Sequence, residues 1–315
     1  ADIDFVREAS MRCDYLMATL NPDDPSLDVY KEYINCSRPL PEWEADTPQE
    51  IKDELKQRVI QLKEQGIQSK LAFIQVGEDQ ASSVYMKNQQ KGCEYVGIQS
   101  LEIKLSAQTT QEELLTIIDQ LNKDDSVNGI LVETPVPKQI HLETIISSID
   151  PRKEMDGFHP LNMGLLTIGG KSCLPCTPAG VIQLLKRSGF QLEGLSCVVV
   201  GRSPNVGIPA AQLMLRENAT VTIAHSRTKN LKEVCKQADI LIVAIGKKKM
   251  ITDEYIKDGA IVVDIGIHVD DDGSLCGDVD FELVKDKVQA ITPVPGGVGP
   301  MTIAMLLSSC LDSIK

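Results

Sequence analysis

The chain has 315 residues, of which 42% are hydrophobic and 24% are charged. This length suggests about two domains, and the balance of residues excludes a disordered chain. Its 32 basic residues stand against 45 acidic ones, for a net charge of −13. We therefore exclude a general binder of nucleic acid or of anionic membranes, since both need a basic face. The net charge does not exclude binding of small anionic ligands, because these need only a local cluster of hydrogen-bond donors.

The nine cysteines are odd in number and scattered, which is typical of reduced thiols in a cytoplasm or an organelle matrix such as the mitochondrial one. Cys173 and Cys176 form a CxxC pair with no second pair at metal-binding spacing, and the four histidines are scattered, so no metal site is expected. No apolar run reaches the ~18–20 residues of a membrane span. The first residues, ADIDFVREAS, lack a signal-peptide core, but a processed leader stays open without an initiator Met.

Residues 1–46 differ from the rest of the chain. Two short stretches with helical spacing of apolar residues lead into an acidic, Pro-containing linker, SRPLPEWEAD. We expect a helical appendage with no chemistry of its own.

From Thr47 onward, helices and strands alternate. A helix is expected over 47–66, with Thr47 as cap, Pro48 next to it and Gly66 at its end. Strands are expected at 70–77, 100–105 and 129–133, with helices over 83–96 and 110–122 between them. Buried strands that alternate with amphipathic helices indicate βαβ units around a parallel sheet.

The second half repeats this pattern. We expect a helix over 177–189, a helix after Pro209 and a last amphipathic helix over 299–314. Strands are expected at 196–201, 219–225, 239–246, 259–266 and 289–294. Two α/β units in series, divided near residues 176–178, are the simplest interpretation.

A nucleotide-binding loop is expected after the strand at 196–201. Gly201 and Gly207 stand in a GxxxxxG spacing, which departs from the common GxGxxG pattern. Gly201 allows a sharp exit from the strand, and Gly207 lets the backbone approach a phosphate. The following helix N-terminus supplies unpaired N–H groups.

The next strand end favours NADP over NAD. An NAD site usually has a carboxylate here for the ribose 2′-hydroxyl, and a carboxylate would repel a 2′-phosphate. This chain has His225, Ser226, Arg227 and Thr228, with Arg202 in the preceding loop. Two guanidinium groups and a hydroxyl suit a 2′-phosphate.

Six motifs from Thr47 to the C-terminus resemble the methylenetetrahydrofolate dehydrogenase/methenyltetrahydrofolate cyclohydrolase family. They are VYMKNQQKGCEYVGI (84–98), DDSVNGILVETPVPKQI (124–140), KEMDGFHPLNMG (153–164), LPCTPAG (174–180), VVVGRSPNVGIPAA (198–211) and ITPVPGGVGPMTIAML (291–306).

The resemblance implies an α/β fold with an extension at 1–46, a folate-binding catalytic domain at 47–177 and a Rossmann-type domain at 178–296. A C-terminal helix at 297–315 would return to the catalytic domain. It also implies a homodimer and two steps of one-carbon metabolism. Hydride loss converts 5,10-methylenetetrahydrofolate into 5,10-methenyltetrahydrofolate, and hydration of that cation gives 10-formyltetrahydrofolate.

The resemblance also implies the site residues. The catalytic and folate-binding ones are Tyr85, Gln89, Glu133, Asp156, Pro295, Gly296, Gly297 and Val298. Those for the dinucleotide are Gly201, Arg202, Ser203, Val206, Gly207, His225, Ser226, Arg227 and Thr228, with Cys176 and Thr177 at the domain boundary.

Two positions depart from the family. Its catalytic lysine lies four residues after the tyrosine, on the same helix face, and here that position is Gln89. Its partner glutamine is here Glu133. Lys87 and Lys91 lie about 200° around the helix from position 89, so neither substitutes directly. A neighbouring aspartate of the family is Glu154.

Hydride loss removes no proton and needs mainly orientation, whereas hydration needs proton handling. Because Gln89 does not titrate, we expect dehydrogenase activity to be kept and cyclohydrolase activity to be weak or absent. In a rival interpretation Glu133 transfers the proton, and a fully bifunctional enzyme is the alternative.

Two other classes stay open. One is a silent folate or nucleotide binder that acts as a regulatory subunit. The other is an unrelated NADP oxidoreductase of amino or hydroxy acids, which would use His159 as its acid, although a structural histidine before Pro160 is the simpler interpretation.

Overall fold

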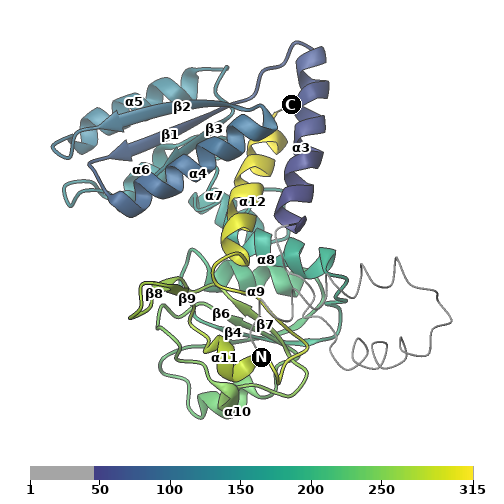
Figure 1. Cartoon of the computed structure of the whole chain (residues 1–315). Helices are drawn as coiled ribbons and strands as arrows, with labels where there is room; N and C mark the ends of the chain where they lie inside the picture. The colour runs from purple at the N-terminus through teal and green to yellow at the C-terminus, as the bar shows by residue number, and fades with distance from the viewer. Residues whose placement is uncertain (1–45, 315) are drawn as a thin grey trace. The chain divides into compact units, whose positions relative to one another are not determined.

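The computed structural model describes residues 46–314, apart from the side chains of residues 46, 80, 81, 83 and 84 (Figure 1). The expectation of a helical appendage at 1–46 therefore falls outside the described residues, except for its last position. Within residues 46–314 the chain forms two parallel sheets and the helices that cover them.

The first sheet has three parallel strands in the order β2-β1-β3. They are β1 (Lys70–Val76), β2 (Gln99–Leu105) and β3 (Gly129–Val132). Along β1 the side chains alternate between two cores: Leu71 and Phe73 join one, and Ala72 and Ile74 join the other. This is the period of two that a strand buried on both faces requires. The three predicted strands are confirmed.

Different helices cover the two faces of this sheet. They are α4 (Gln80–Val96), α5 (Gln111–Lys123), α6 (Leu142–Ser148) and α7 (Pro160–Thr167). Met86 and Cys93 of α4 belong to the core of Phe73, whereas α5 and α6 fill the core of Ile74. Helix α4 begins at Gln80, three residues before its predicted start, because Asp79 caps it by accepting from the Ser82 backbone N–H at 2.8 Å.

The second sheet has five parallel strands in the order β10-β7-β6-β4-β5. They are β4 (Ser196–Val200), β5 (Thr220–Ala224), β6 (Ile240–Val243), β7 (Ile261–Asp264) and β10 (Ala290–Ile291). The helices of this half are α8 (Cys176–Arg187), α9 (Gly207–Arg216), α10 (Leu231–Cys235), η1 (Asp253–Tyr255) and α11 (Phe281–Val284). A short hairpin of β8 (His268–Val269) and β9 (Leu275–Cys276) was not predicted.

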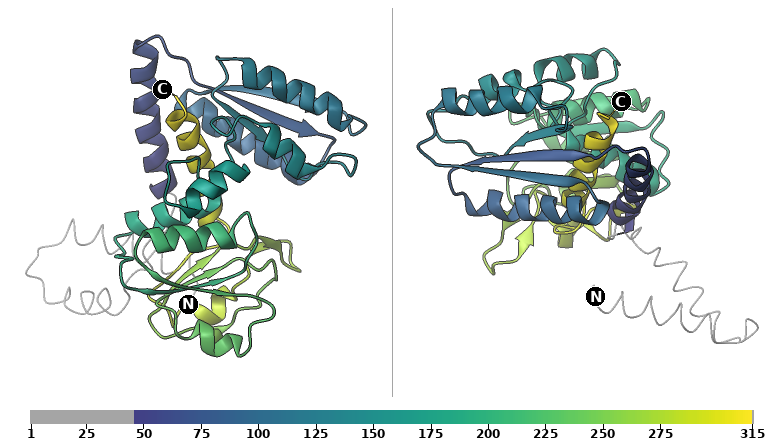
Figure 2. Two further views of the ribbon diagram at one scale, coloured as in Figure 1. Left: turned by 180° about the vertical axis from the view of Figure 1, so that it is seen from behind. Right: turned by 90° about the horizontal axis from the view of Figure 1, so that it is seen from above.

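Two helices far apart in the sequence, α3 (Asp46–Glu64) and α12 (Val298–Asp312), pack side by side (Figure 2). Arg58 of α3 forms an ion pair with Asp312 at 2.5 Å and donates to the Leu311 carbonyl at 2.8 Å. Helix α12 also packs on α4 and α8. The two-domain α/β fold and the return of the last helix to the first domain are confirmed, while the predicted domain limits stay predictions.

Candidate active site

The first sheet and α4 meet where β3 ends. The backbone N–H of Glu133, the residue after β3, donates to the Ile74 carbonyl at 2.8 Å. The next carbonyl, of Thr134, accepts from the Ser82 hydroxyl of α4 at 2.7 Å. This link fixes the strand end against the first turn of α4, so that Glu133 lies beside the helix face that carries Tyr85 and Gln89.

Tyr85, Gln89 and Glu133 form a cluster. Tyr85 and Gln89 are one helical turn apart, and the Gln89 amide contacts both the Tyr85 hydroxyl and the Glu133 carboxyl. Gln89 exposes 2% of its surface and Glu133 exposes 6%. The Oε1 atoms of both have no hydrogen-bond partner among the described residues. Two buried acceptors without donors indicate that the cluster has room for one more proton.

Burial controls the protonation of this cluster. It raises the pKa of Glu133 to about 7, and the contact with Gln89 acts in the opposite direction. Burial also raises the pKa of Asp156 well above its ordinary value, helped by Glu154 and Glu133. Although Tyr85 exposes 36% of its surface, burial of its hydroxyl raises the pKa of Tyr85, with smaller contributions from Cys176 and Asp156. Near neutral pH the cluster can therefore gain and lose a proton.

The loop that carries Asp156 is built around Glu154. The buried Glu154 carboxylate accepts from the backbone N–H groups of Asp156 at 3.0 Å and His159 at 2.9 Å. Gly157 has a φ of +76°, and a Cβ there would lie 2.4 Å from the backbone of Leu174. Glu154 stands where the family motif has an aspartate, and its carboxylate holds this loop in place.

Cys176 and Thr177 were expected beside the dinucleotide, but their hydrogen-bond partners lie near the first sheet and on α12. The Cys176 thiol is buried and donates to the Met155 carbonyl at 3.1 Å. The Thr177 and Thr302 hydroxyls are 3.0 Å apart, which joins α8 to α12.

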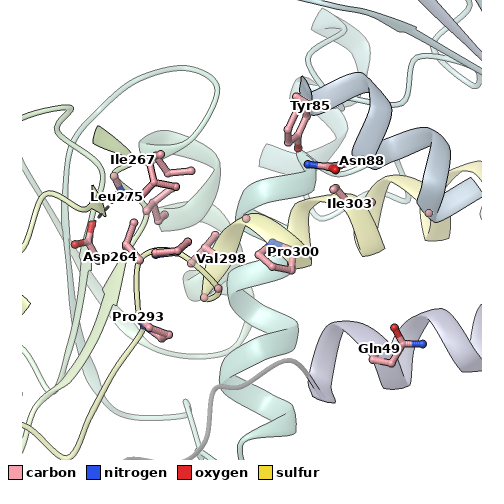
Figure 3. A pocket seen from close by; sticks show the side chains of 18 of the residues that line it. Gln49, Tyr85, Asn88, Asp264, Ile267, Leu275, Pro293, Val298, Pro300 and Ile303 are labelled. Carbon is pink, nitrogen blue, oxygen red and sulfur yellow. Dashed lines mark hydrogen bonds between the residues drawn. The ribbon is translucent and has the colours of Figure 1, made fainter. Parts of the chain in front are cut away.

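A cleft of about 560 Å³ opens beside this cluster (Figure 3). Its walls come from α3, α4, α12, the strand end at Asp264 and the loop from Pro293 to Val298. Tyr85 and the expected Pro295–Val298 loop line it, whereas Gln89, Glu133 and Asp156 are absent from its lining. Asp156 instead lines a smaller neighbouring cavity with Thr134 and Asn205. Since Asn205 belongs to the expected nucleotide loop, this loop reaches the acidic residue expected to bind folate.

Several cleft residues were not predicted from the sequence. Asn88, Lys91 and Tyr95 continue the Tyr85 stripe along α4, and Gln49 and Lys52 come from α3. The three-to-four-residue spacing of the α4 residues was a usable signal. The α3 residues carried no such signal, because only packing brings α3 to the cleft.

Asp264 holds the far wall of the cleft. It accepts from the backbone N–H groups of Gly266 at 2.9 Å and Val279 at 2.8 Å. Its own N–H donates to the Thr292 hydroxyl at 2.7 Å, which ties β7 to the segment before the Pro-Gly-Gly-Val loop. Burial raises the pKa of Asp264 to about 6 despite these hydrogen bonds. A Cβ on Gly277 would lie 1.9 Å from Asp264 Oδ2, so only glycine fits there.

The loop between β4 and α9 has the close packing that a phosphate-binding turn needs. Gly201 has a φ of +131°, and a Cβ there would lie 2.2 Å from the Ala244 carbonyl. A Cβ on Gly207 would lie 2.4 Å from the Gly201 carbonyl. The Ser203 hydroxyl accepts from the N–H groups of Val206 and Gly207 at 3.2 Å each. The turn leads into α9, a helix of ten residues. The unpaired N–H groups predicted at its start are not observed, because those of Gly207 and Ile208 donate to Ser203 and Pro209 has none.

The residues expected at the ribose end lie at the neighbouring strand end, since Val200 of β4 pairs with Ala224 of β5. His225 and Thr228 shape the turn: the His225 N–H donates to the Thr228 hydroxyl at 2.8 Å. Arg202, Ser226 and Arg227 are exposed, and neither guanidinium has an ion-pair partner within 46–314. Both are therefore available to an anionic ligand.

His159, the candidate acid of the alternative oxidoreductase, has a structural role. Its Nδ1 accepts from the Leu161 N–H at 3.0 Å, which caps α7. Within residues 46–314, no group of three or more His, Cys, Asp or Glu side chains could hold a metal ion. In the same range, no helix has the length and apolar character to cross a membrane.

Comparisons with known proteins agree with this geometry. The model of the tetrahydrofolate dehydrogenase/cyclohydrolase catalytic domain matches residues 45–156, and that of the family's NAD(P)-binding domain matches residues 175–315. The bifunctional protein FolD of Agathobacter rectalis is 60% identical over 266 residues, which cover 84% of this chain and 95% of the relative.

Two solved structures are also similar. The bifunctional methylenetetrahydrofolate dehydrogenase/cyclohydrolase FolD from Campylobacter jejuni is 47% identical with a TM-score of 0.84, covering 87% of this chain and 97% of that one. The Trypanosoma brucei dehydrogenase-cyclohydrolase, complexed with NADP and an inhibitor, is 34% identical with a TM-score of 0.80, covering 84% and 94%. The chain therefore belongs to the tetrahydrofolate dehydrogenase/cyclohydrolase family.

Proposed function

We propose that this chain oxidises 5,10-methylenetetrahydrofolate to the methenyl cation and hydrates that cation to 10-formyltetrahydrofolate. The observation that carries the proposal is that Tyr85 and the Pro-Gly-Gly-Val loop line one cleft, while Asp156 and Asn205 of the nucleotide loop line a second, smaller cavity. The names of relatives at 60% and 47% identity support both activities.

Hydride loss needs orientation and a site that tolerates positive charge. A bound NADP⁺ would accept the hydride. The folate carbon between N5 and N10 becomes cationic, and the carboxyls of Glu133 and Asp156 near Tyr85 favour that charge when they are ionised. No step here requires the missing lysine.

Hydration requires a proton acceptor, and Glu133 is our candidate. Water adds to the cationic carbon and gives up one proton, the bond from carbon to N5 then breaks, and N5 takes a proton. The hydroxyl proton of the intermediate leaves as the formyl group forms. A carboxyl whose pKa is about 7 can accept and return a proton at neutral pH. Glu133→Gln should therefore lose hydration and keep hydride transfer.

A second candidate is a dehydrogenase without cyclohydrolase activity. Gln89 favours it, because an amide in the position of the family's lysine cannot titrate. One experiment separates the two: incubation with methylenetetrahydrofolate and NADP⁺ while the methenyl absorbance is followed. A bifunctional enzyme clears the methenyl intermediate faster than buffer does, whereas a dehydrogenase alone lets it accumulate.

We propose NADP rather than NAD as the dinucleotide. Arg202, Ser226 and Arg227 support this, because guanidinium groups bind phosphate well and no carboxylate follows β5. KM values for both dinucleotides test it: a lower KM for NADP⁺ is expected, and equal or reversed values would contradict it. The homodimer stays a prediction.

A further inference from the structure

Asp278 is a fully buried carboxylate that the proposed chemistry does not use. Its Oδ2 atom accepts from the backbone N–H groups of Ile245 at 2.7 Å and Gly246 at 3.0 Å. Its Oδ1 atom accepts from the Lys247 N–H at 2.7 Å and lies 2.8 Å from His268 Nε2. Since a carboxylate only accepts, Nε2 carries the hydrogen of this last bond. Asp278 thus holds one backbone turn, residues 245–247, and one histidine.

The turn that Asp278 holds borders the expected dinucleotide site. It follows β6 and begins next to Ala244, whose carbonyl would lie 2.2 Å from a Cβ on Gly201. Strand β4 pairs with β5 on one side and with β6 on the other, so the strand order reverses at β4. Open parallel sheets bind ligands at the carboxyl ends of the strands where the order reverses. The turn at 245–247 and the loop at Gly201 therefore form the two sides of this crevice.

The histidine that Asp278 holds belongs to the wall of the larger cleft. His268 begins the β8–β9 hairpin, and the preceding Ile267 lines the cleft together with Leu275 of β9. Figure 3 shows Ile267 and Leu275 together on one side of the cleft. A Cβ on Gly266 would lie 2.5 Å from Asp278 Cγ, so the backbone that leads into the hairpin packs directly on the carboxylate. Asp278 therefore contacts both the nucleotide turn and the cleft wall.

We propose that Asp278 and His268 are positioning residues for hydride transfer. Asp278 fixes the turn at 245–247 beside the dinucleotide, and His268 ties this turn to the Ile267 wall, so that the two ligands keep one relative geometry. This proposal rests on the proposed function, since it places a folate and a dinucleotide in the adjoining sites.

The role of the pair is geometric. The hydride leaves the folate carbon between N5 and N10 and joins the nicotinamide ring of NADP⁺, and neither residue exchanges a proton in this step. Because the rate depends steeply on how the two carbons are aligned, a loosened link should slow hydride transfer more than it weakens the binding of either ligand.

Two variants separate the hydrogen bond of His268 from the size of its side chain. His268→Gln and His268→Met introduce side chains of similar length, but only glutamine has an N–H donor for Asp278 Oδ1. Stopped-flow formation of NADPH at saturating methylenetetrahydrofolate and NADP⁺ measures the hydride step. We expect His268→Met to slow this step and lower kcat roughly 10-fold, with both KM values within about 2-fold of the wild type. His268→Gln should restore a rate close to that of the wild type.

His141→Met is the matched control, because His141 is an exposed histidine outside the lining of both cavities. It should match the wild type in rate and in both KM values. Thermal unfolding checks that each variant is folded. If His268→Met does not fold, His268→Leu takes its place in the same comparison. If neither folds while His268→Gln does, the bond supports the fold alone and the proposal is overturned.

The remaining outcomes separate the two proposals. A wild-type rate in His268→Met, a loss that His268→Gln shares, or a higher KM at an unchanged rate would overturn the positioning role and leave the proposed function intact. A wild type that forms no NADPH from methylenetetrahydrofolate would overturn the proposed function and the positioning role with it.

Discussion

Replacing Glu133 with glutamine measures how strongly the fold opposes an ionised carboxylate at that position. In the folded protein the pKa of Glu133 is about 7, against an ordinary value of 4.5. The folded state thus holds a proton that the unfolded chain loses between these pH values. Stability therefore falls as the pH rises from about 4.5 to about 7 and then levels off.

The magnitude follows from the shift. One pKa unit corresponds to about 1.4 kcal/mol, so ionised Glu133 costs about 3 kcal/mol at pH 8. The glutamine variant avoids this cost because its amide does not ionise. We expect Glu133→Gln to be more stable than the wild type by about 3 kcal/mol at pH 8 and by about 1 kcal/mol at pH 5.

Thermal unfolding followed by circular dichroism at both pH values measures the difference. For a chain of 315 residues the expected gain in Tm at pH 8 is roughly 4–5 °C. Glu94→Gln, an exposed change on the same helix as Gln89, is the control and should shift Tm equally at both pH values. A variant whose Tm difference from the wild type does not grow between pH 5 and pH 8 would refute the reasoning.

Three further predictions concern the active site and the nucleotide loop. Gln89→Lys places an ammonium group beside Glu133, which should lower the pKa of the Glu133 carboxyl. The acid limb of the pH profile for hydration should therefore move below pH 7. If that limb does not move, Glu133 is not the proton acceptor. Gly201→Ala should raise the KM for NADP⁺ at least 10-fold because of the 2.2 Å approach to Ala244, whereas Gly194→Ala, also at positive φ but with open space, should leave that KM unchanged. Arg227→Ala should raise the KM for NADP⁺ roughly 10-fold and leave that for NAD⁺ unchanged, and an equal effect on both would show that Arg227 does not bind the 2′-phosphate.

Much of the fold follows from local pattern. The buried runs at β1, β4, β6 and β7 were predicted from consecutive apolar residues, and the helix predicted from Thr110 begins there with a capping box between Thr110 and Glu113. The Asp79 cap of α4 was not predicted, so the start of that helix was placed three residues too late. The strands β2 and β5 were predicted although their side chains are largely exposed, because β-branched and apolar residues alternate there. Helix α7 was missed because it is short and weakly amphipathic, and its start depends on the His159 cap.

Some features of the active site could likewise be predicted from the sequence, and others could not. The pairing of Gln89 with Glu133 was predicted from the family motifs, and helical spacing places Tyr85 on the face of Gln89. The contribution of α3 could not be predicted, since Lys52 reaches the cleft only through packing of α3 on α4 and α12. Likewise, Asp264 and Gly277 are thirteen residues apart, and their contact depends on a hairpin that no periodicity marks.

The measurement that tests the central claim most directly is the time course of methenyltetrahydrofolate during oxidation of methylenetetrahydrofolate with NADP⁺, compared between the wild type and Glu133→Gln. We predict that the wild type forms the intermediate and clears it faster than buffer does. The variant should form it at a similar rate and leave it to accumulate. Equal clearance by both proteins would contradict the account of Glu133, and a wild type that forms no methenyl species would contradict the proposed function itself.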